Sequence, residues 1–142
     1  MVEEVIHNSK VFAIIIRSDF NSTGIQFFTP NEYSQQLAYM NRAEGYAIHP
    51  HLHNPVHREV HVTQEVLYIK SGMVRVDFYD NLKIYIESRI LNKGDVILLA
   101  YGGHGFHMLE ASEIIEIKQG PYVGDNDKSR FDPVDSNFLK IN

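Results

Sequence analysis

The sequence predicts an all-β fold, and three observations support this prediction. Short runs rich in β-branched and aromatic residues recur along the chain. Residues that tolerate tight turns separate several of them, as in Ser71-Gly72, Asp80-Asn81 and Asn92-Lys93-Gly94-Asp95. No long segment has the apolar spacing of an amphipathic helix. The combination is typical of a meander or a small barrel.

Ten runs are predicted to be strands because they have the length and residue types that strands favour. In chain order they are Val11 to Ile16, Gly24 to Phe28, Gln36 to Asn41, Tyr46 to His53, Val60 to Lys70, Val74 to Tyr79, Leu82 to Leu91, Val96 to Ala100, Phe106 to Leu109 and Ile114 to Lys118. The one helical window, Thr29 to Gln35, contains Pro30, which suits a first helical position. It is too short for more than one turn.

Length and composition predict one domain over residues 1–142, because 142 residues with 44% hydrophobic content can bury a core of ordinary size. We expect N-terminal strands over residues 1–35, a barrel over 36–118 and a C-terminal arm over 119–142. Apolar residues of the arm, together with the apolar run Val11 to Ile16, exceed what one small barrel readily covers, which predicts a homodimer. These arm residues are Phe131, Phe138, Leu139 and Ile141.

Composition also excludes several kinds of site. The chain has no cysteine, so a metal ion would need nitrogen and oxygen ligands. The net charge is −5 and the 13 Lys and Arg residues are scattered, which argues against a nucleic-acid partner. No signal peptide or membrane span is recognisable, so a cytoplasmic protein without a membrane partner is expected.

Five of the eight histidines lie within thirteen residues, between His49 and His61. In a strand, His49, His51 and His53 would project from the same face, because alternate side chains share a face. Neutral imidazoles are common ligands of transition metals. The carboxylate of Glu65 follows shortly after. The segment therefore predicts a metal site within the all-β fold.

The spacing of these residues resembles the first motif of the cupin superfamily. That motif has a glycine, five residues, His-x-His, three or four residues, a glutamate, six residues and a second glycine. Here Gly45 is followed after five residues by His51-Leu52-His53, and Glu65 is followed after six residues by Gly72. Eleven residues separate His53 from Glu65, which we interpret as an inserted hairpin loop over Asn54 to His61.

The run from Gly94 to His107 resembles the second cupin motif, with Ala100 in the place of its proline. His104 comes one residue before the position of the motif histidine, and His107 comes two residues after it. We prefer His104 as the metal ligand, because the preceding pair Gly102-Gly103 can absorb a deletion. In a strand the two histidines face opposite sides, so only one of them readily faces the interior.

The resemblance implies a small β-barrel of the jelly-roll (double-stranded β-helix) type, made of two antiparallel sheets. It implies a divalent metal, one of Fe, Mn, Ni, Zn or Cu, held by His51, His53, Glu65 and His104, with His107 as the alternative to His104. Glu65, His61 and His107 are the candidate proton carriers. His61 shares the parity of Glu65 and would line the pocket in an unbroken strand.

Three functions are compatible with such a site. The first is a metal-dependent isomerase or epimerase that acts on a small molecule such as a sugar or sugar derivative. The others are an iron-dependent dioxygenase and a non-catalytic module that binds a metal or ligand. The grouping of Lys118, Gln119 and Tyr122 at the end of the last run is similar to endings in small cupins of bacterial surface-sugar gene sets. Arg58 and Arg75 are candidate clamps for a carboxylate or phosphate.

Overall fold

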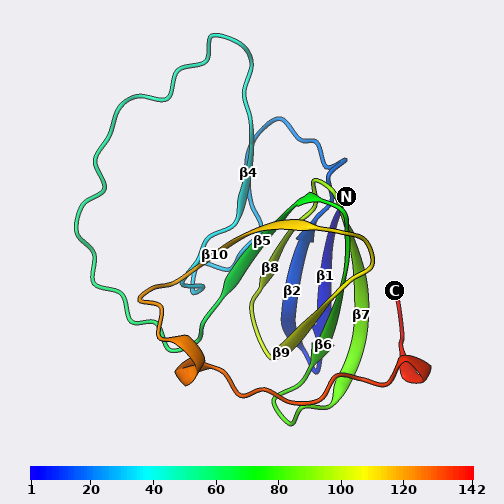
Figure 1. Ribbon diagram of the computed structural model, residues 1–142. Coiled ribbons are helices and arrows are strands. Elements are labelled where there is room, and N and C mark those ends of the chain that lie inside the picture. The colour runs from blue at the N-terminus through cyan, green and yellow to red at the C-terminus, as the bar shows by residue number, and fades with distance from the viewer.

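The computed structural model describes residues 1–142 and contains ten β-strands, two 3₁₀-helices and no α-helix (Figure 1). All strand pairs within the sheets are antiparallel. The strands are β1 (Val2–His7), β2 (Lys10–Ile16), β3 (Gly24–Phe27), β4 (Ala38–Asn41), β5 (Glu65–Ser71), β6 (Met73–Tyr79), β7 (Tyr85–Asn92), β8 (Val96–Leu99), β9 (Gly103–Met108) and β10 (Glu113–Lys118). The all-β prediction is therefore confirmed.

Two sheets enclose the core. The larger sheet has the order β1-β2-β8-β5-β10, and the smaller one has the order β7-β6-β9. One cluster of twelve buried apolar residues joins them, with Ile15, Leu67 and Ile97 from the larger sheet and Val76 and Phe78 from the smaller one. Strands β9 and β10 each end their sheet, so each has one edge without a partner strand. The other edge strands are β1 and β7, and β9 and β10 follow one another in the chain.

The turns that join these strands are the ones that the sequence predicts. Gly72, between β5 and β6, has a φ of +83°, and a Cβ atom there would lie 2.3 Å from the backbone oxygen of Ala111. In the turn between β7 and β8, the amide of Asp95 donates a hydrogen bond to the carbonyl of Asn92 at 3.0 Å. Each of these turns joins a strand of one sheet to a strand of the other, so both sheets can pack on the same core.

Asp95, a residue of the second motif, stabilises the fold through the hydrogen bonds of its carboxylate. Its side chain is buried and accepts hydrogen bonds from the amides of Ser18 at 2.8 Å and Asn92 at 2.9 Å. The guanidinium of Arg17 donates to the same carboxylate at 2.9 Å and also binds Glu3 at 2.6 Å. These bonds satisfy a buried charge and fasten the end of β2 to the turn that begins β8.

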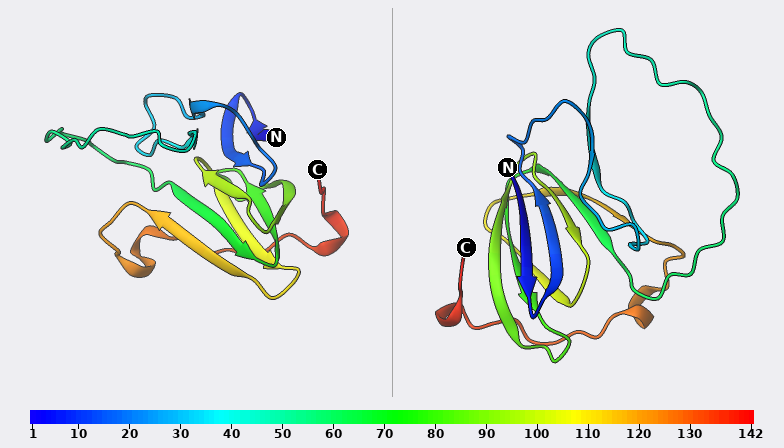
Figure 2. Two further views of the ribbon diagram at one scale, coloured as in Figure 1. Left: turned by 90° about the horizontal axis from the view of Figure 1, so that it is seen from above. Right: turned by 180° about the vertical axis from the view of Figure 1, so that it is seen from behind.

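The third structural unit is the hairpin β3-β4, which forms a separate two-stranded sheet. After it, residues 42–64 have no regular secondary structure and form a wide loop beside the two sheets (Figures 1 and 2). The predicted strand Tyr46 to His53 is wrong for this structure, as is the N-terminal part of the predicted run Val60 to Lys70. A strand needs a neighbour to satisfy its backbone groups, and none lies beside this loop. The irregular segment is therefore longer than the predicted hairpin loop Asn54 to His61.

The N- and C-terminal segments both pack on the sheets. β1, which the list of predicted runs lacks, pairs along the whole of β2. The C-terminal arm contains two 3₁₀-helices, η1 (Gly124–Asp127) and η2 (Ser136–Phe138), and crosses the smaller sheet. There the ring of Phe131 contacts Tyr79 with centroids 5.0 Å apart, and Ile141 forms a bridge with Ser88. The Thr29 to Gln35 window makes only a turn, in which the amide of Tyr33 donates to the carbonyl of Pro30.

None of the helical segments has the length and apolar character that a transmembrane helix requires.

Candidate functional site

Glu65 and His104 meet across the interior from opposite sheets. Glu65 begins β5 and has the same parity as the core residues Leu67 and Ile69. His104 on β9 pairs with the core residue Phe78 on β6. The Nε2 atom of His104 lies 3.2 Å from Oε2 of Glu65. Two residues 39 positions apart in the sequence are therefore brought into hydrogen-bond distance by the packing of one sheet on the other.

Lys118 completes this group from the adjacent strand, because it lies directly opposite Glu65 in the β5-β10 register. Its Nζ atom is 3.7 Å from Oε1 of Glu65 and 3.2 Å from Oε1 of Glu116. The ammonium also lies 5.6 Å from the centre of the Tyr122 ring. The two oxygens of Glu65 thus have different neighbours, an imidazole at one and an ammonium at the other.

The charges around Glu65 favour its ionised form. Its pKa lies below the usual value of 4.5, chiefly because of the hydrogen bond with His104, and burial opposes this effect only in part. The pKa of Lys118 is raised, first by its hydrogen bond with Glu116 and also by the charge of Glu65. At neutral pH the site therefore presents a carboxylate and an ammonium side by side.

The interior beside this group is apolar and open to solvent. Phe106 and Met108 share the face of His104 on β9, and their side chains are 38% and 45% exposed. The ring of Phe106 lies 5.3 Å from the imidazole of His104. Polar groups at one end of an apolar, accessible surface can orient a small molecule while most of its surface is covered.

A network of amides and a hydroxyl holds the start of β5 in place. The buried side chain of Gln64 accepts hydrogen bonds from the Ser34 hydroxyl and the Gln35 amide, both at 3.2 Å. The backbone amide of Gln64 donates to the side chain of Gln119 at 2.9 Å, and Gln119 in turn donates to Ser34 at 2.6 Å. Sequence reasoning missed this network, since its partners are far apart in the chain and only Gln119 stood out.

The structure does not bring the predicted histidine ligands to Glu65. His51 and His53 are exposed in the wide loop, where their rings lie 5.2 Å apart. The Nδ1 atom of His51 is 2.9 Å from the carbonyl oxygen of His49. No group of three or more His, Asp or Glu side chains is close enough to hold a metal ion. Of the four predicted ligands, the structure brings together Glu65 and His104.

The remaining candidates lie away from this group. His107 is exposed on the opposite face of β9, because its parity differs from that of His104. His61 is in the wide loop, 3.4 Å from the carboxylate of Glu59. Arg75 forms a partly buried ion pair with Asp77 at 2.8 Å, and Arg58 is exposed in the loop without an ion pair. The guanidinium of Arg75, predicted as a clamp for a ligand, therefore binds Asp77 within the fold.

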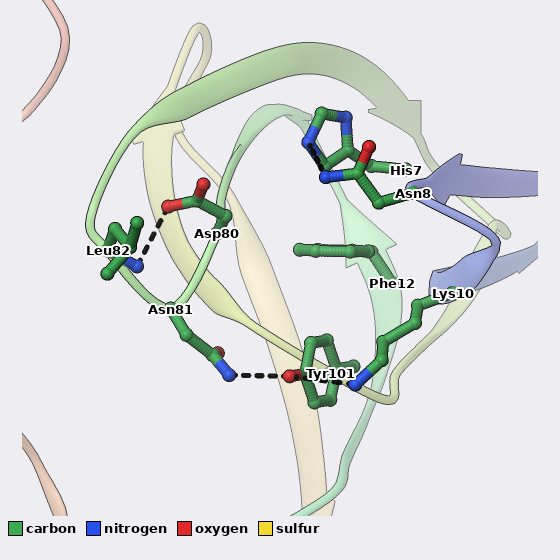
Figure 3. A pocket seen from close by; sticks show the side chains of 8 residues that line it. All are labelled: His7, Asn8, Lys10, Phe12, Asp80, Asn81, Leu82 and Tyr101. Carbon is green, nitrogen blue, oxygen red and sulfur yellow. Dashed lines mark hydrogen bonds between the residues drawn. The ribbon is translucent and has the colours of Figure 1, made fainter.

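A cavity of about 200 Å³ lies in another part of the fold, lined by residues of the β1-β2 and β6-β7 turns and by Tyr101 (Figure 3). Tyr101 accepts hydrogen bonds from Lys10 at 3.1 Å and Asn81 at 2.5 Å. The ammonium of Lys10 lies 4.3 Å from the centre of the same ring. These contacts satisfy the polar groups, and none of the lining residues is a predicted site residue. The Glu65 group is therefore the better candidate.

Comparison of the chain with protein-family models, curated proteins and solved structures gave no match, so the function is inferred from the site itself.

Proposed function

We propose that the protein is a metal-dependent isomerase or epimerase of cupin type that acts on a small carbonyl or polyhydroxylated compound, such as a sugar derivative. The observation that carries the proposal is the pair of Glu65 and His104, 3.2 Å apart between two sheets. It lies beside an accessible apolar surface and an ammonium group. Such a group can bind a polar molecule and move one of its protons.

The donor set suits a divalent transition metal. Metal to ligand distances of about 2.1 Å place neighbouring ligands about 3.0 to 3.4 Å apart on an octahedral or tetrahedral ion. The His104 to Glu65 distance of 3.2 Å falls in this range. An imidazole and a carboxylate are ligands that Fe, Mn, Ni, Cu and Zn accept. In the proposal, His51 and His53 of the wide loop supply the remaining protein ligands.

The metal would polarise a carbonyl or hydroxyl oxygen of the substrate. Oε2 of Glu65 faces His104, which leaves Oε1, on the side of Lys118, for proton transfer. A carboxylate with a lowered pKa is a weak base, so the proton that it accepts must first be made acidic by polarisation of the neighbouring carbonyl. The Lys118 ammonium donates a hydrogen bond to the oxygen on which negative charge develops.

The first test is metal content. We expect about one equivalent of Fe, Mn, Ni, Cu or Zn per chain by elemental analysis, and a loss of affinity of about tenfold or more in His104→Ala and in Glu65→Gln. His107→Ala is the matched control on the same strand and should bind metal as the wild type does. Retention of full affinity in His104→Ala would contradict the proposed ligand set.

The second test is proton exchange. A panel of sugars and sugar nucleotides is incubated with the metal-loaded protein in deuterated water, and NMR follows incorporation at carbons next to a carbonyl. The proposal expects incorporation that Glu65→Gln abolishes. Ligand binding without any incorporation would favour a binding module over an enzyme.

A further inference from the structure

The segment of residues 42–63, named the histidine arm, lacks the contacts that hold the rest of the chain. All its residues are exposed, and no backbone hydrogen bond joins residues 47–63 to any other part of the protein. Loops of more than about 12 to 15 residues without secondary structure are uncommon in compact domains and usually have a function. In Figures 1 and 2 the arm extends well away from both sheets.

The composition of the histidine arm differs from that of a solvated loop. Six large apolar side chains are exposed along it, at fractions from 46% for Val60 to 93% for Leu52. The others are Tyr46, Ile48, Val56 and Val62. Exposed apolar side chains at this density usually mark a segment that packs against a partner.

The sheets have an unfilled position that suits such a segment. The free edges of β9 and β10 present unpaired backbone groups, and an edge of this kind is a template for an added strand. The β9 edge adjoins the interior face that carries His104, Phe106 and Met108. A strand added at β9 with His51 and His53 toward the interior would place both imidazoles beside His104 and Glu65.

A second copy of this chain is the occupant that the observations favour. The arm begins at β4, which is held in the β3-β4 hairpin and by a hydrogen bond from Asn41 to Asn21 at 3.0 Å. From there it extends away from its own β9. The arm is fixed at both ends, to β4 at Asn41 and to β5 at Glu65, so it can reach out by at most half its extended length. At about 3.3 Å per residue this is about 38 Å, enough to reach a neighbouring subunit.

Apolar surface outside the core offers a face for that second copy. Ile115 and Ile117 on β10 are 49% and 56% exposed, on the side of the sheet away from the interior. In the β3-β4 hairpin, Ile25 and Phe27 are exposed as well. Two copies that cover these faces in a symmetric dimer would each present an arm to the other.

We infer that two copies exchange their histidine arms, so that residues 46–53 of one chain pair with β9 of the other and complete its site. The inference rests on the proposed function, because it assigns the missing metal ligands to the partner chain. It adds that each site is built from two chains and is incomplete in a monomer.

Cysteine cross-linking tests the exchange without reference to metal. The chain has no cysteine, so every disulfide reports the engineered positions. Leu52 has the parity opposite to His51 and His53, and His107 lies on the outer face of β9, so we expect these two positions to meet. Chains carrying L52C and chains carrying H107C, co-expressed with different tags, should form a mixed disulfide dimer, whereas neither alone should cross-link comparably.

The same pair in one chain gives the decisive comparison. If L52C/H107C forms only an internal disulfide in a monomeric chain, the arm pairs with its own β9 and the exchange is wrong. If no disulfide forms in either arrangement, the arm does not pair with β9 at all, which also overturns it.

Metal complementation tests the shared site. In a mixed dimer of H51A/H53A chains and H104A chains, purified through two tags, exchange leaves one intact site out of two. At a metal concentration that just saturates the wild type, we expect about half its metal content, while each variant alone binds about tenfold or more weakly. No metal in the mixed dimer would refute the shared site. A cross-link without metal in the wild type would instead refute the proposed function and leave the exchange supported.

Discussion

At the scale of single residues, Glu65 combines burial with an imidazole beside one carboxylate oxygen and an ammonium beside the other. It is 7% exposed, lies 3.2 Å from His104 and 3.7 Å from Lys118, and stays ionised at neutral pH because these groups lower its pKa. A glutamate in such a position is either a part of the scaffold or a part of a site. The apolar, accessible surface beside it favours a site.

The lowered pKa of Glu65 predicts a specific dependence of stability on pH. Because the folded-state pKa lies below the usual value of 4.5, the stabilising contribution is fully present above that value and is lost as pH falls through the folded-state pKa. The wild type should therefore lose stability more steeply below about pH 4.5 than Glu65→Gln, which has no such group to protonate. Urea unfolding at pH 7 and pH 3.5 measures the difference.

Glu32→Gln is the control for this experiment, because it removes an exposed carboxylate from the 30–36 turn. Its stability should follow the wild type at both pH values. An equal loss of unfolding free energy between pH 7 and pH 3.5 in the wild type and in Glu65→Gln would show that His104 and Lys118 do not stabilise the ionised carboxylate.

At the scale of elements, the turns decide how the strands meet. Gly72 and Gly45 both have positive φ angles, +83° and +80° respectively. A Cβ atom at Gly72 would lie 2.3 Å from the Ala111 carbonyl oxygen, whereas nothing lies within 4 Å of the corresponding position at Gly45. The two glycines of the first motif therefore have different reasons to be glycine in this structure.

This difference predicts unequal effects of alanine. Gly45→Ala should cost about 1 to 2 kcal/mol of unfolding free energy, which is the strain of a left-handed residue. Gly72→Ala should cost more, because the backbone at Ala111, in the segment that leads into β10, must also move. Urea denaturation of both variants gives the comparison, and similar losses would mean that the close contact at Gly72 relaxes freely.

At the scale of the whole molecule, the free edges of β9 and β10 and the histidine arm are complementary. Both have unpaired backbone groups, and both carry exposed apolar side chains. In a monomer the histidine arm and these strand edges do not contact each other. Pairing them would satisfy backbone groups and cover apolar surface in the same step.

Arm exchange predicts that protection of the arm depends on protein concentration. Amides of residues 46–53 should exchange slowly with deuterium where the dimer prevails and rapidly after dilution to monomer, because only the paired strand protects them. Amides of Val74 to Phe78 in the core serve as the internal control and should keep their protection on dilution. Mass spectrometry of the peptides reports both. Rapid exchange of residues 46–53 at every concentration would contradict the paired state.

The sequence by itself determined the local features of this protein. Alternating apolar residues and turn residues predict most of the strands, since both depend on neighbours in the chain. The parity of β9 likewise distinguishes His104 from His107, because successive side chains of a strand face opposite sides. These properties need no knowledge of distant contacts.

The tertiary structure alone decided which distant residues meet. The pairing of β5 with β10 brings Lys118 to Glu65, and the packing of the two sheets brings His104 to it, although both are about 40 or more residues away in the chain. It also decided that Tyr46 to His53, with a strand-like pattern, has no neighbour within its own chain. A pattern shows what a segment is able to form, whereas its hydrogen-bond partner is set by the arrangement of every other strand.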